Sequence, residues 1–258
     1  MGGFLFDDII FGPVKSRRLG VSLGINLLPV DYKFCTFDCI YCECGWTKKT
    51  DKKIVLPSRQ EIFERLEFVL KDRKKNDLPI DSITYAGNGE PTLHPNFAEI
   101  IDDTIELRNT YFPKAIITVL SNASLIHNEK IIKALLKVDK NILKLDAGSE
   151  ERFRAINQPN GSLSLDKVVD YLKKFNGHLI IQTLFLQGLG LHQGIENVSD
   201  DAIENWLTLL KEIKPQSVML YPIERETPEN SIVKINEATL NQIAKKVEAA
   251  GFKTEVFH

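Results

Sequence analysis

The chain has 258 residues and a formal net charge of −2; 43% of the residues are hydrophobic and 26% are charged. This composition is typical of a globular domain with a substantial core. The near-neutral net charge gives no overall positive field that would attract nucleic acid or an anionic membrane. No apolar run approaches the roughly 20 residues needed to span a bilayer. The N-terminal segment is acidic where a signal peptide would be basic. We therefore expect a cytoplasmic protein without a membrane segment.

Short apolar segments alternate with segments of helical periodicity along the chain. The expected strands are 21–28, 82–86, 115–120, 141–146, 178–186 and 217–221. The expected helices are 58–70, 95–111, 128–136, 164–175, 200–213 and 236–251. Ser58 and Glu61 have the spacing of a capping box, Asn128 and Asn236 are suitable N-caps, and Gly251 suits a helix end.

Six strand–helix units predict an α/β fold with a parallel sheet, because such crossovers are right-handed and return each strand parallel to the last. Six units are too few for an eight-stranded barrel, so we expect an open sheet or a partial (β/α)6 TIM-like barrel. In both, ligands bind at the carboxyl ends of the strands. We expect a single domain over 1–258, with an irregular lead-in flap at 1–18, the partial barrel at 19–225, and a C-terminal helix and tail at 226–258.

All four cysteines, Cys35, Cys39, Cys42 and Cys44, lie within one ten-residue stretch after the first expected strand. Secreted disulfide frameworks spread their cysteines, so this crowding favours a metal site. Three thiolates at spacings of four and three residues can hold an iron–sulfur cubane and leave one iron open for another ligand. The alternative is a zinc knuckle that uses all four cysteines, for which the two-residue separation of Cys42 and Cys44 is awkward.

The segment Cys35-Thr-Phe-Asp-Cys39-Ile-Tyr41-Cys42 resembles the radical SAM superfamily, whose hallmark is C-x-x-x-C-x-aromatic-C after the first strand. The resemblance implies a radical SAM core in which the three cysteines bind a [4Fe–4S] cluster. It also implies that S-adenosylmethionine (SAM) binds the open iron, with Tyr41 beside the cofactor. Cys44 has no place in the motif.

The same resemblance implies further contacts to SAM. A glycine-rich turn with an acidic residue follows the second strand in this family, and here that turn contains Asn88, Gly89 and Glu90. Glu90 would receive the SAM amino group, since a carboxylate pairs well with an ammonium. Ser121 and Asn122 at the end of the third strand, and Asp146 at the end of the fourth, would contact the ribose or the carboxylate of SAM.

Most of the chain resembles the wyosine-synthase-like subgroup of these proteins. The resembling segments include Gly12-Pro-Val-Lys-Ser-Arg-Arg-Leu-Gly20, Lys144-Leu-Asp-Ala-Gly148 and Ile156-Asn-Gln-Pro159. The named member modifies a tRNA base and uses a second cluster bound by upstream cysteines. Residues 1–34 contain no cysteine here, so we take fold and radical initiation from the resemblance and keep tRNA modification as an alternative.

Two basic residues are candidates for contacting the substrate. Lys144 lies two residues before Asp146, so both side chains should face the same side of their strand. It can bind a substrate carboxylate or form an imine, or it can pair with a nearby carboxylate. Arg225 follows the sixth strand and, like the cluster of Lys15, Arg17 and Arg18, can bind an anionic group or remain solvated.

The resemblance implies reductive cleavage of SAM to a 5′-deoxyadenosyl radical, which abstracts hydrogen from a substrate. The electron would come from a small redox protein, a flavodoxin or a ferredoxin. The sequence leaves the substrate open among a small molecule, a peptide and tRNA. Two other classes remain as rivals: a non-catalytic iron–sulfur electron carrier or sensor, and a zinc-stabilised binding module.

Overall fold

The computed structural model describes residues 3–16, 19–47, 54–189 and 195–257. Their strands form one nine-stranded sheet in the order β1-β2-β3-β4-β5-β6-β7-β9, and β8 pairs with β6 off this path. The strands are β1 (Ile10–Ser16), β2 (Gly20–Ile25), β3 (Ser82–Tyr85), β4 (Ile116–Ser121), β5 (Lys140–Lys144), β6 (Ile180–Gly188), β7 (Ser217–Pro222), β8 (Ile232–Lys234) and β9 (Thr254–Val256).

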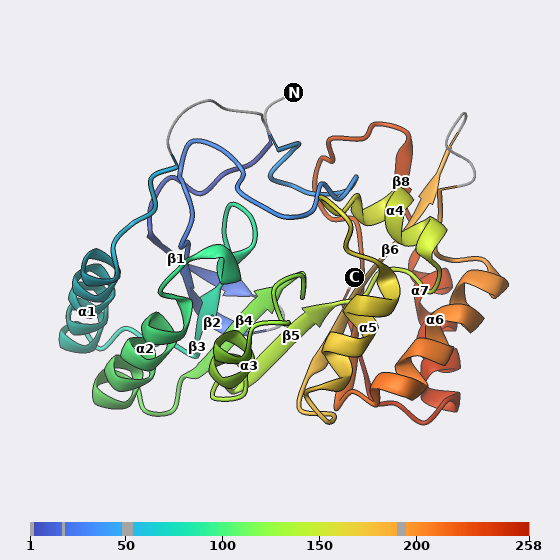
Figure 1. Ribbon diagram of the computed structural model, residues 1–258. Helices are drawn as coiled ribbons and strands as arrows, with labels where there is room; N and C mark the ends of the chain where they lie inside the picture. The colour runs from blue at the N-terminus through green and yellow to red at the C-terminus, as the bar shows by residue number, and fades with distance from the viewer. Residues whose placement is uncertain (1–2, 17–18, 48–53, 190–194, 258) are drawn as a thin grey trace.

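Neighbouring strands from β2 to β7 are all parallel, as is the β7–β9 pair. The helices lie along the outside of the curved sheet (Figure 1). They are α1 (Arg59–Lys75), α2 (Phe97–Tyr111), α3 (Glu129–Leu135), α4 (Glu150–Asn157), α5 (Leu165–Lys173), α6 (Asp200–Ile213) and α7 (Glu237–Ala249), with a short 3₁₀ turn, η1 (Pro91–Leu93). The predicted α/β class and parallel sheet are confirmed.

Local sequence signals explain where the helices begin. The side chains of Ser58, Asn128, Ser164 and Asn236 each accept a hydrogen bond from a backbone N–H of the first turn of α1, α3, α5 and α7. Such caps satisfy donors that otherwise have no partner inside the helix. The six strands predicted from apolar runs and the helices predicted between them are present, with ends shifted by a few residues.

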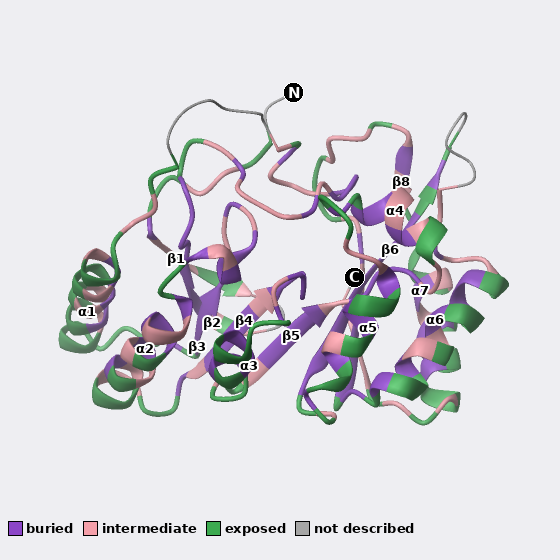
Figure 2. Ribbon diagram, in the orientation of Figure 1, coloured by how far each residue is buried: buried purple, intermediate pink, exposed green. Residues whose placement is uncertain are grey.

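The hydrophobic core lies mainly between the sheet and its helices, where Figure 2 shows the buried helix faces. Strand side chains alternate between the two faces, so Leu143 of β5 belongs to this core. Its neighbour Ile142 belongs instead to a small second cluster with Ile180 and Met219. The other face therefore keeps room for polar side chains near the strand ends.

The N-terminal lead-in differs from the sequence prediction. Residues 10–16, expected to be irregular, form β1, which pairs antiparallel with β2. The register shifts between Phe11 and Val14, around Gly12 and Pro13, and such an irregularity hides the alternation that predicts a strand. Gly24 lets the Phe11 ring lie against β2, since a Cβ there would stand 2.1 Å from a ring carbon.

The C-terminal part also contributes more to the sheet than the expected helix and tail. Residues 254–256 form β9 beside β7, and residues 232–234 form β8 beside β6. The eight-residue helix α4, before α5, was also not predicted, because it is short and four of its residues are charged. In the described parts of the chain, no helix combines the length and apolarity needed to cross a membrane.

Candidate functional site

The cysteine loop follows β2 and is held from both sides at the carboxyl edge of the sheet. On one side, the Phe34 N–H donates to the Asn88 carbonyl at 2.8 Å, and the Glu90 N–H donates to the Phe34 carbonyl at 3.2 Å. On the other side, the Ile40 N–H donates to the Ile156 carbonyl at 3.0 Å. The loop thus lies between the turn after β3 and the end of α4, beside the predicted cofactor residues.

Nitrogen donors form hydrogen bonds to two of the three motif sulfurs. The Sγ of Cys35 accepts from the Phe37 N–H at 3.4 Å and from Asn122 Nδ2 at 3.5 Å. The Sγ of Cys39 accepts from Asn157 Nδ2 at 3.5 Å. Hydrogen bonds to sulfur are typical of iron–sulfur thiolates, where they help set the reduction potential. The donor set therefore fits an iron–sulfur cluster.

Within the described ranges, no three His, Cys, Asp or Glu side chains are grouped as ligands of one metal ion. Each thiolate that holds a cubane bonds a different iron atom of the cluster. The sulfur ligands of a cubane therefore lie further apart than the four ligands around one zinc ion. A cubane held by Cys35, Cys39 and Cys42 therefore does not require such a group of ligands.

A buried lysine lies beside the thiols. Lys33 is 2% exposed, and its Nζ donates to Asp38 Oδ1 and to the Gly45 carbonyl, each at 3.1 Å. Burial alone would lower the pKa of Lys33, but the charges of Cys42, Cys35 and Cys39 and the bond to Asp38 hold this pKa above its usual value. The site thus places a cation against all three motif cysteines.

The thiols differ in how readily they ionise. A hydrogen bond from Cys44, with the nearby charges of Lys33 and Lys144, overcomes burial and lowers the pKa of Cys42 to about 6. Burial and the charge of Glu90 raise the pKa of Cys35 to about 12. The bond to Cys42 raises the pKa of Cys44. Cys42 is thus the motif cysteine whose surroundings most favour the thiolate, the form that binds metal.

Glu90 is buried where the turn after β3 meets the end of β4. Its Oε1 accepts from the Thr92 N–H at 3.1 Å, from Thr92 Oγ1 at 2.5 Å and from Ser121 Oγ at 2.8 Å. Its Oε2 accepts from the Asn122 N–H at 2.6 Å. Burial raises the pKa of Glu90, although these hydrogen bonds oppose the shift. A carboxylate oxygen can accept two bonds, so Oε2 keeps capacity for an ammonium.

Asn88 ties the turn to two other segments. Its Nδ2 donates to the carbonyls of Phe6 and Pro29, each at 2.8 Å, and its Oδ1 accepts from the Phe6 N–H at 2.8 Å. Its backbone N–H donates to Asn26 Oδ1 at 3.1 Å. These contacts favour a role in holding the site together, while the expected contact between Asn88 and a cofactor stays a prediction.

Gly89 makes the close approach of the cysteine loop possible. Its φ is +146°, and a Cβ at this position would lie 1.8 Å from the Phe34 carbonyl oxygen. Only glycine commonly adopts this backbone region. The Phe34–Gly89 contact therefore depends on the absence of a side chain.

Gly89→Ala is expected to displace the cysteine loop and to lower the midpoint of thermal unfolding far more than Gly161→Ala does. Gly161 has φ +73° and nothing within 4 Å of an added Cβ, so alanine there meets only the backbone cost of about 1–2 kcal/mol. Thermal unfolding of both variants, followed by circular dichroism, makes the comparison. Equal midpoints for the two variants would show that the loop does not depend on the close approach at Gly89.

Asp146 lies at the centre of a buried polar network at the end of β5. Its Oδ2 accepts from the Tyr41 hydroxyl and, at 2.6 Å, from Asn157 Nδ2. Its Oδ1 accepts from the Leu184 N–H at 3.0 Å. Burial and the charge of Asp146 raise the pKa of Tyr41 well above its usual value. The motif aromatic Tyr41 is thereby fixed to the strand ends, and Asn157 links the same network to Cys39.

Lys144 belongs to this network. Its Nζ donates to the Tyr41 hydroxyl oxygen at 2.6 Å and lies 3.5 Å from Asp146 Oδ2. Of the roles considered for Lys144 from the sequence, the structure contains the pairing with a carboxylate. The charge of Lys144 is thus largely balanced by Asp146, whose side chain is completely buried.

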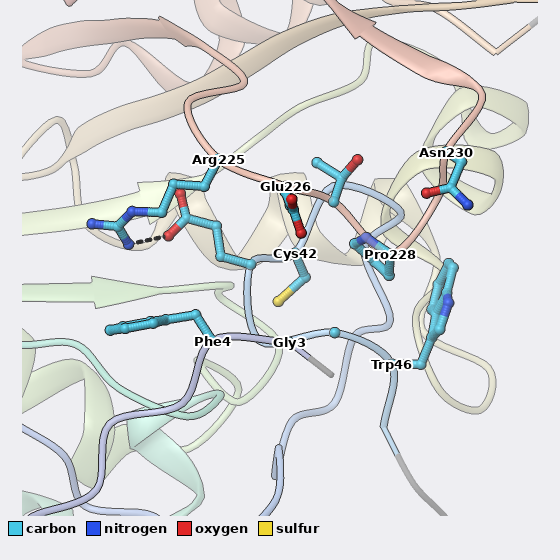
Figure 3. A pocket seen from close by; sticks show the side chains of 11 residues that line it. Gly3, Phe4, Cys42, Trp46, Arg225, Glu226, Pro228 and Asn230 are labelled. Atoms are coloured by element: carbon cyan, nitrogen blue, oxygen red, sulfur yellow. Dashed lines mark hydrogen bonds and ion pairs between the residues drawn. The ribbon is translucent and has the colours of Figure 1, made fainter. Parts of the chain in front are cut away.

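Arg225 lies elsewhere, on a cavity of about 430 Å³ that Cys42, Phe4 and Trp46 also line (Figure 3). Its Nη1 donates to Glu43 Oε2 at 2.5 Å, and its guanidinium lies 5.2 Å from the centre of the Phe4 ring. The cavity thus borders one of the motif cysteines. Arg17 and Arg18 of the predicted basic cluster lie outside the described residues.

Sequence reasoning missed several side chains of the site, Lys33, Asp38 and Asn157 among them. Lys33 and Asp38 flank Cys35 in the sequence, but a lysine in a loop gives no sign that it will be buried. Asn157 lies in the Ile156–Pro159 segment noted for its resemblance, yet its contacts with Cys39 and Asp146 follow only from the fold. Its presence in that segment is the one signal that pointed to it.

Residues 30–218 match the sequence model of the radical SAM superfamily. A protein of Brachyspira hyodysenteriae named GTPase Obg is 32% identical over 244 residues, which cover 93% of this chain and 33% of that protein. A UPF0026 protein of Methanocaldococcus jannaschii is 36% identical over 217 residues, which cover 82% of this chain and 62% of that protein. The chain thus spans less than two thirds of both relatives.

The crystal structure of a radical SAM methyltransferase from Sphaerobacter thermophilus matches with a TM-score of 0.66 and 15% identity, over 92% of this chain and 65% of that one. A match at 15% identity shows similarity of fold alone. It confirms the predicted partial TIM-like barrel. The wyosine-synthase-like subgroup stays a prediction. Since the family model covers the chain from the cysteine loop into β7, the protein belongs to the radical SAM superfamily.

Proposed function

We propose that Cys35, Cys39 and Cys42 bind the [4Fe–4S] cluster that radical SAM enzymes use together with SAM. The observation that carries this assignment is the set of nitrogen donors directed at the sulfurs of Cys35 and Cys39, with Lys33 beside all three cysteines. When bound and reduced, the cluster would supply the electron that cleaves SAM to methionine and a 5′-deoxyadenosyl radical.

The residues around the cluster would then bind and orient SAM. Glu90 would accept the SAM ammonium on Oε2, the oxygen that carries a single hydrogen bond. Ser121 and Asn122 hold that carboxylate in place through an Oγ–H and a backbone N–H. Asp146 and Tyr41 would lie on the Cys39 side of the SAM site, and Gly89 keeps the cysteine loop close to Glu90.

In the proposed reaction the radical would abstract hydrogen from a substrate, and a one-electron donor such as a flavodoxin or a ferredoxin would reduce the cluster. Lys144 at the end of β5 and Arg225 on the cavity beside Cys42 are the proposed substrate contacts. Superfamily membership leaves the substrate open among a small molecule, a peptide and tRNA, so base modification remains the alternative within the same chemistry.

The experiment that tests this function is anaerobic reconstitution followed by incubation with SAM, dithionite and deuterated candidate substrates. We expect 5′-deoxyadenosine to form, and deuterium to enter it when the correct substrate class is present. The matched control is the triple Cys35/Cys39/Cys42→Ala variant under the same conditions. If wild type formed no more 5′-deoxyadenosine than this variant, the proposed function would be wrong.

We also expect one cluster and no auxiliary cluster. A second cubane would need three or four further thiolates, and the sequence supplies only Cys44 beyond the motif. Iron and sulfide analysis with Mössbauer spectroscopy should therefore find about four irons per chain in wild type. The triple cysteine variant should hold essentially none, and a residual cubane signal in it would contradict the single-cluster assignment and favour wyosine-like chemistry.

A further inference from the structure

Lys33 is an unusual residue to find inside a protein. Its side chain is 1% exposed, and its two hydrogen-bond partners are Asp38 Oδ1 and the Gly45 carbonyl. A lysine almost never loses its solvent contact completely unless a partner compensates its charge. The way in which the charge of Lys33 is compensated therefore indicates its role.

The carboxylate partner compensates only part of that charge. The Asp38 side chain is 24% exposed, and its Oδ1 also accepts from the Thr47 N–H at 2.8 Å. Water screens an exposed charge strongly and a buried one weakly. The negative charge of Asp38 is therefore damped, whereas the positive charge of Lys33 acts on its surroundings through a poorly screening interior.

Both partners of Lys33 belong to the cysteine loop, since Asp38 directly precedes Cys39 and Gly45 directly follows Cys44. The ammonium therefore lies against the loop that carries the motif cysteines, and its charge interacts with Cys35, Cys39 and Cys42. The second lysine near the thiols, Lys144, differs in the burial of its partner. Its Nζ lies 3.5 Å from Asp146 Oδ2; the Lys144 side chain is 17% exposed and that of Asp146 is 0% exposed, so a fully buried carboxylate balances its charge. Of the two lysines whose charges act on the thiols, Lys33 is therefore the one without a fully buried carboxylate beside it.

A [4Fe–4S] cluster held by three thiolates carries net negative charge, and reduction adds one more negative charge. A neighbouring buried cation stabilises the reduced form more than the oxidised form. We propose that Lys33 is a positioning residue that raises the reduction potential of the cluster and thereby determines which one-electron donors can drive SAM cleavage. This inference rests on the proposed binding of the cluster by the three cysteines.

The experiment compares wild type with Lys33→Gln, which removes the charge but can still donate to the Gly45 carbonyl, and with Lys33→Arg, which keeps the charge. Lys137→Gln is the matched control, because Lys137 pairs with Asp102 on the surface. Each protein is reconstituted anaerobically and analysed for iron and sulfide. Its midpoint potential is then measured by redox titration followed by electron paramagnetic resonance, at low and at high salt.

Lys33→Gln is expected to lower the midpoint potential by at least about 59 mV, a tenfold change in a one-electron equilibrium. Lys33→Arg and Lys137→Gln should remain close to wild type. The shift should persist at high salt, because salt screens a buried charge much less than an exposed one.

Two results would overturn the role of Lys33. One is an unchanged potential in Lys33→Gln at full iron content. The other is equal loss of iron from the Gln and Arg variants, which would assign Lys33 to supporting the loop alone. Failure of the proposed function has a different signature, since wild type itself would then hold no cluster.

Discussion

Replacing Cys35, Cys39 or Cys42 with alanine is expected to abolish cluster binding, whereas Cys44→Ala is expected to keep it. Each motif thiolate would bond a different iron, and the amides beside Cys35 and Cys39 are hydrogen-bond donors that cannot replace a missing ligand. Iron and sulfide per chain, with the visible charge-transfer absorption recorded under argon, measure the loss. The expected change is from about four irons to nearly none.

Cys42 requires an additional variant, because Cys44 hydrogen-bonds to it and is the one remaining thiol of the chain. If Cys42→Ala retains some iron, the double variant Cys42→Ala/Cys44→Ala should lose it, since the substitute ligand is then gone. Full iron content in Cys35→Ala or Cys39→Ala, where no spare thiol is adjacent in sequence, would show that the ligands have been assigned wrongly.

Glu90→Gln is expected to retain the cluster and to weaken SAM binding by roughly ten- to hundredfold, about 1.5–3 kcal/mol for a lost charge-assisted hydrogen bond. The glutamine keeps the shape of the side chain and one carbonyl oxygen, but it loses the negative charge. Calorimetric titration of the reconstituted protein with SAM measures the change. An unchanged dissociation constant at full iron content would show that the SAM ammonium binds elsewhere.

The structure indicates why glutamine is a better test than alanine. Glu90 accepts from Thr92, Ser121 and Asn122, so its removal would leave several buried donors without a partner, each at a cost of about 1–3 kcal/mol. Thr92→Val is the matched control, because it deletes one of these hydrogen bonds but leaves the carboxylate. It should lower the free energy of unfolding and leave SAM affinity nearly unchanged.

Much of the fold could be predicted because its signals are local. The capping pair Ser58 and Glu61, the caps Asn128 and Asn236, and the apolar strand runs each depend on a few neighbouring residues. The strand β1 was missed because an irregularity in register interrupts its pattern, and β9 because three residues are too few to show any alternation. Each is stabilised by pairing with another strand, β1 with the adjacent β2 and β9 with the more distant β7, and a pattern within the strand itself does not contain this pairing.

In the candidate site, too, the local features could be predicted from the sequence and the long-range contacts could not. The cysteine motif is contiguous, so its spacing is visible in the sequence, and superfamily membership is confirmed. The environment of the motif is assembled from distant residues: Asn157 is 118 positions from Cys39, and Asp146 is 105 positions from Tyr41. Neither the burial of Lys33 nor the four hydrogen bonds that Glu90 accepts can be predicted from the periodicity or the composition of the sequence. These contacts required the three-dimensional arrangement.

The long-range attachment of the cysteine loop also has a consequence for folding during synthesis. Glu43, one residue after the motif, pairs with Arg225, 182 positions later, and Cys39 depends on Asn157 of α4. Contacts between distant positions form late, since closing a long loop costs entropy before any contact forms. Until residues 157 and 225 have been synthesised, the turn after β3 is one attachment available to the cysteine loop. Cluster insertion should therefore follow the synthesis of these residues, so products truncated before residue 157 would not retain iron.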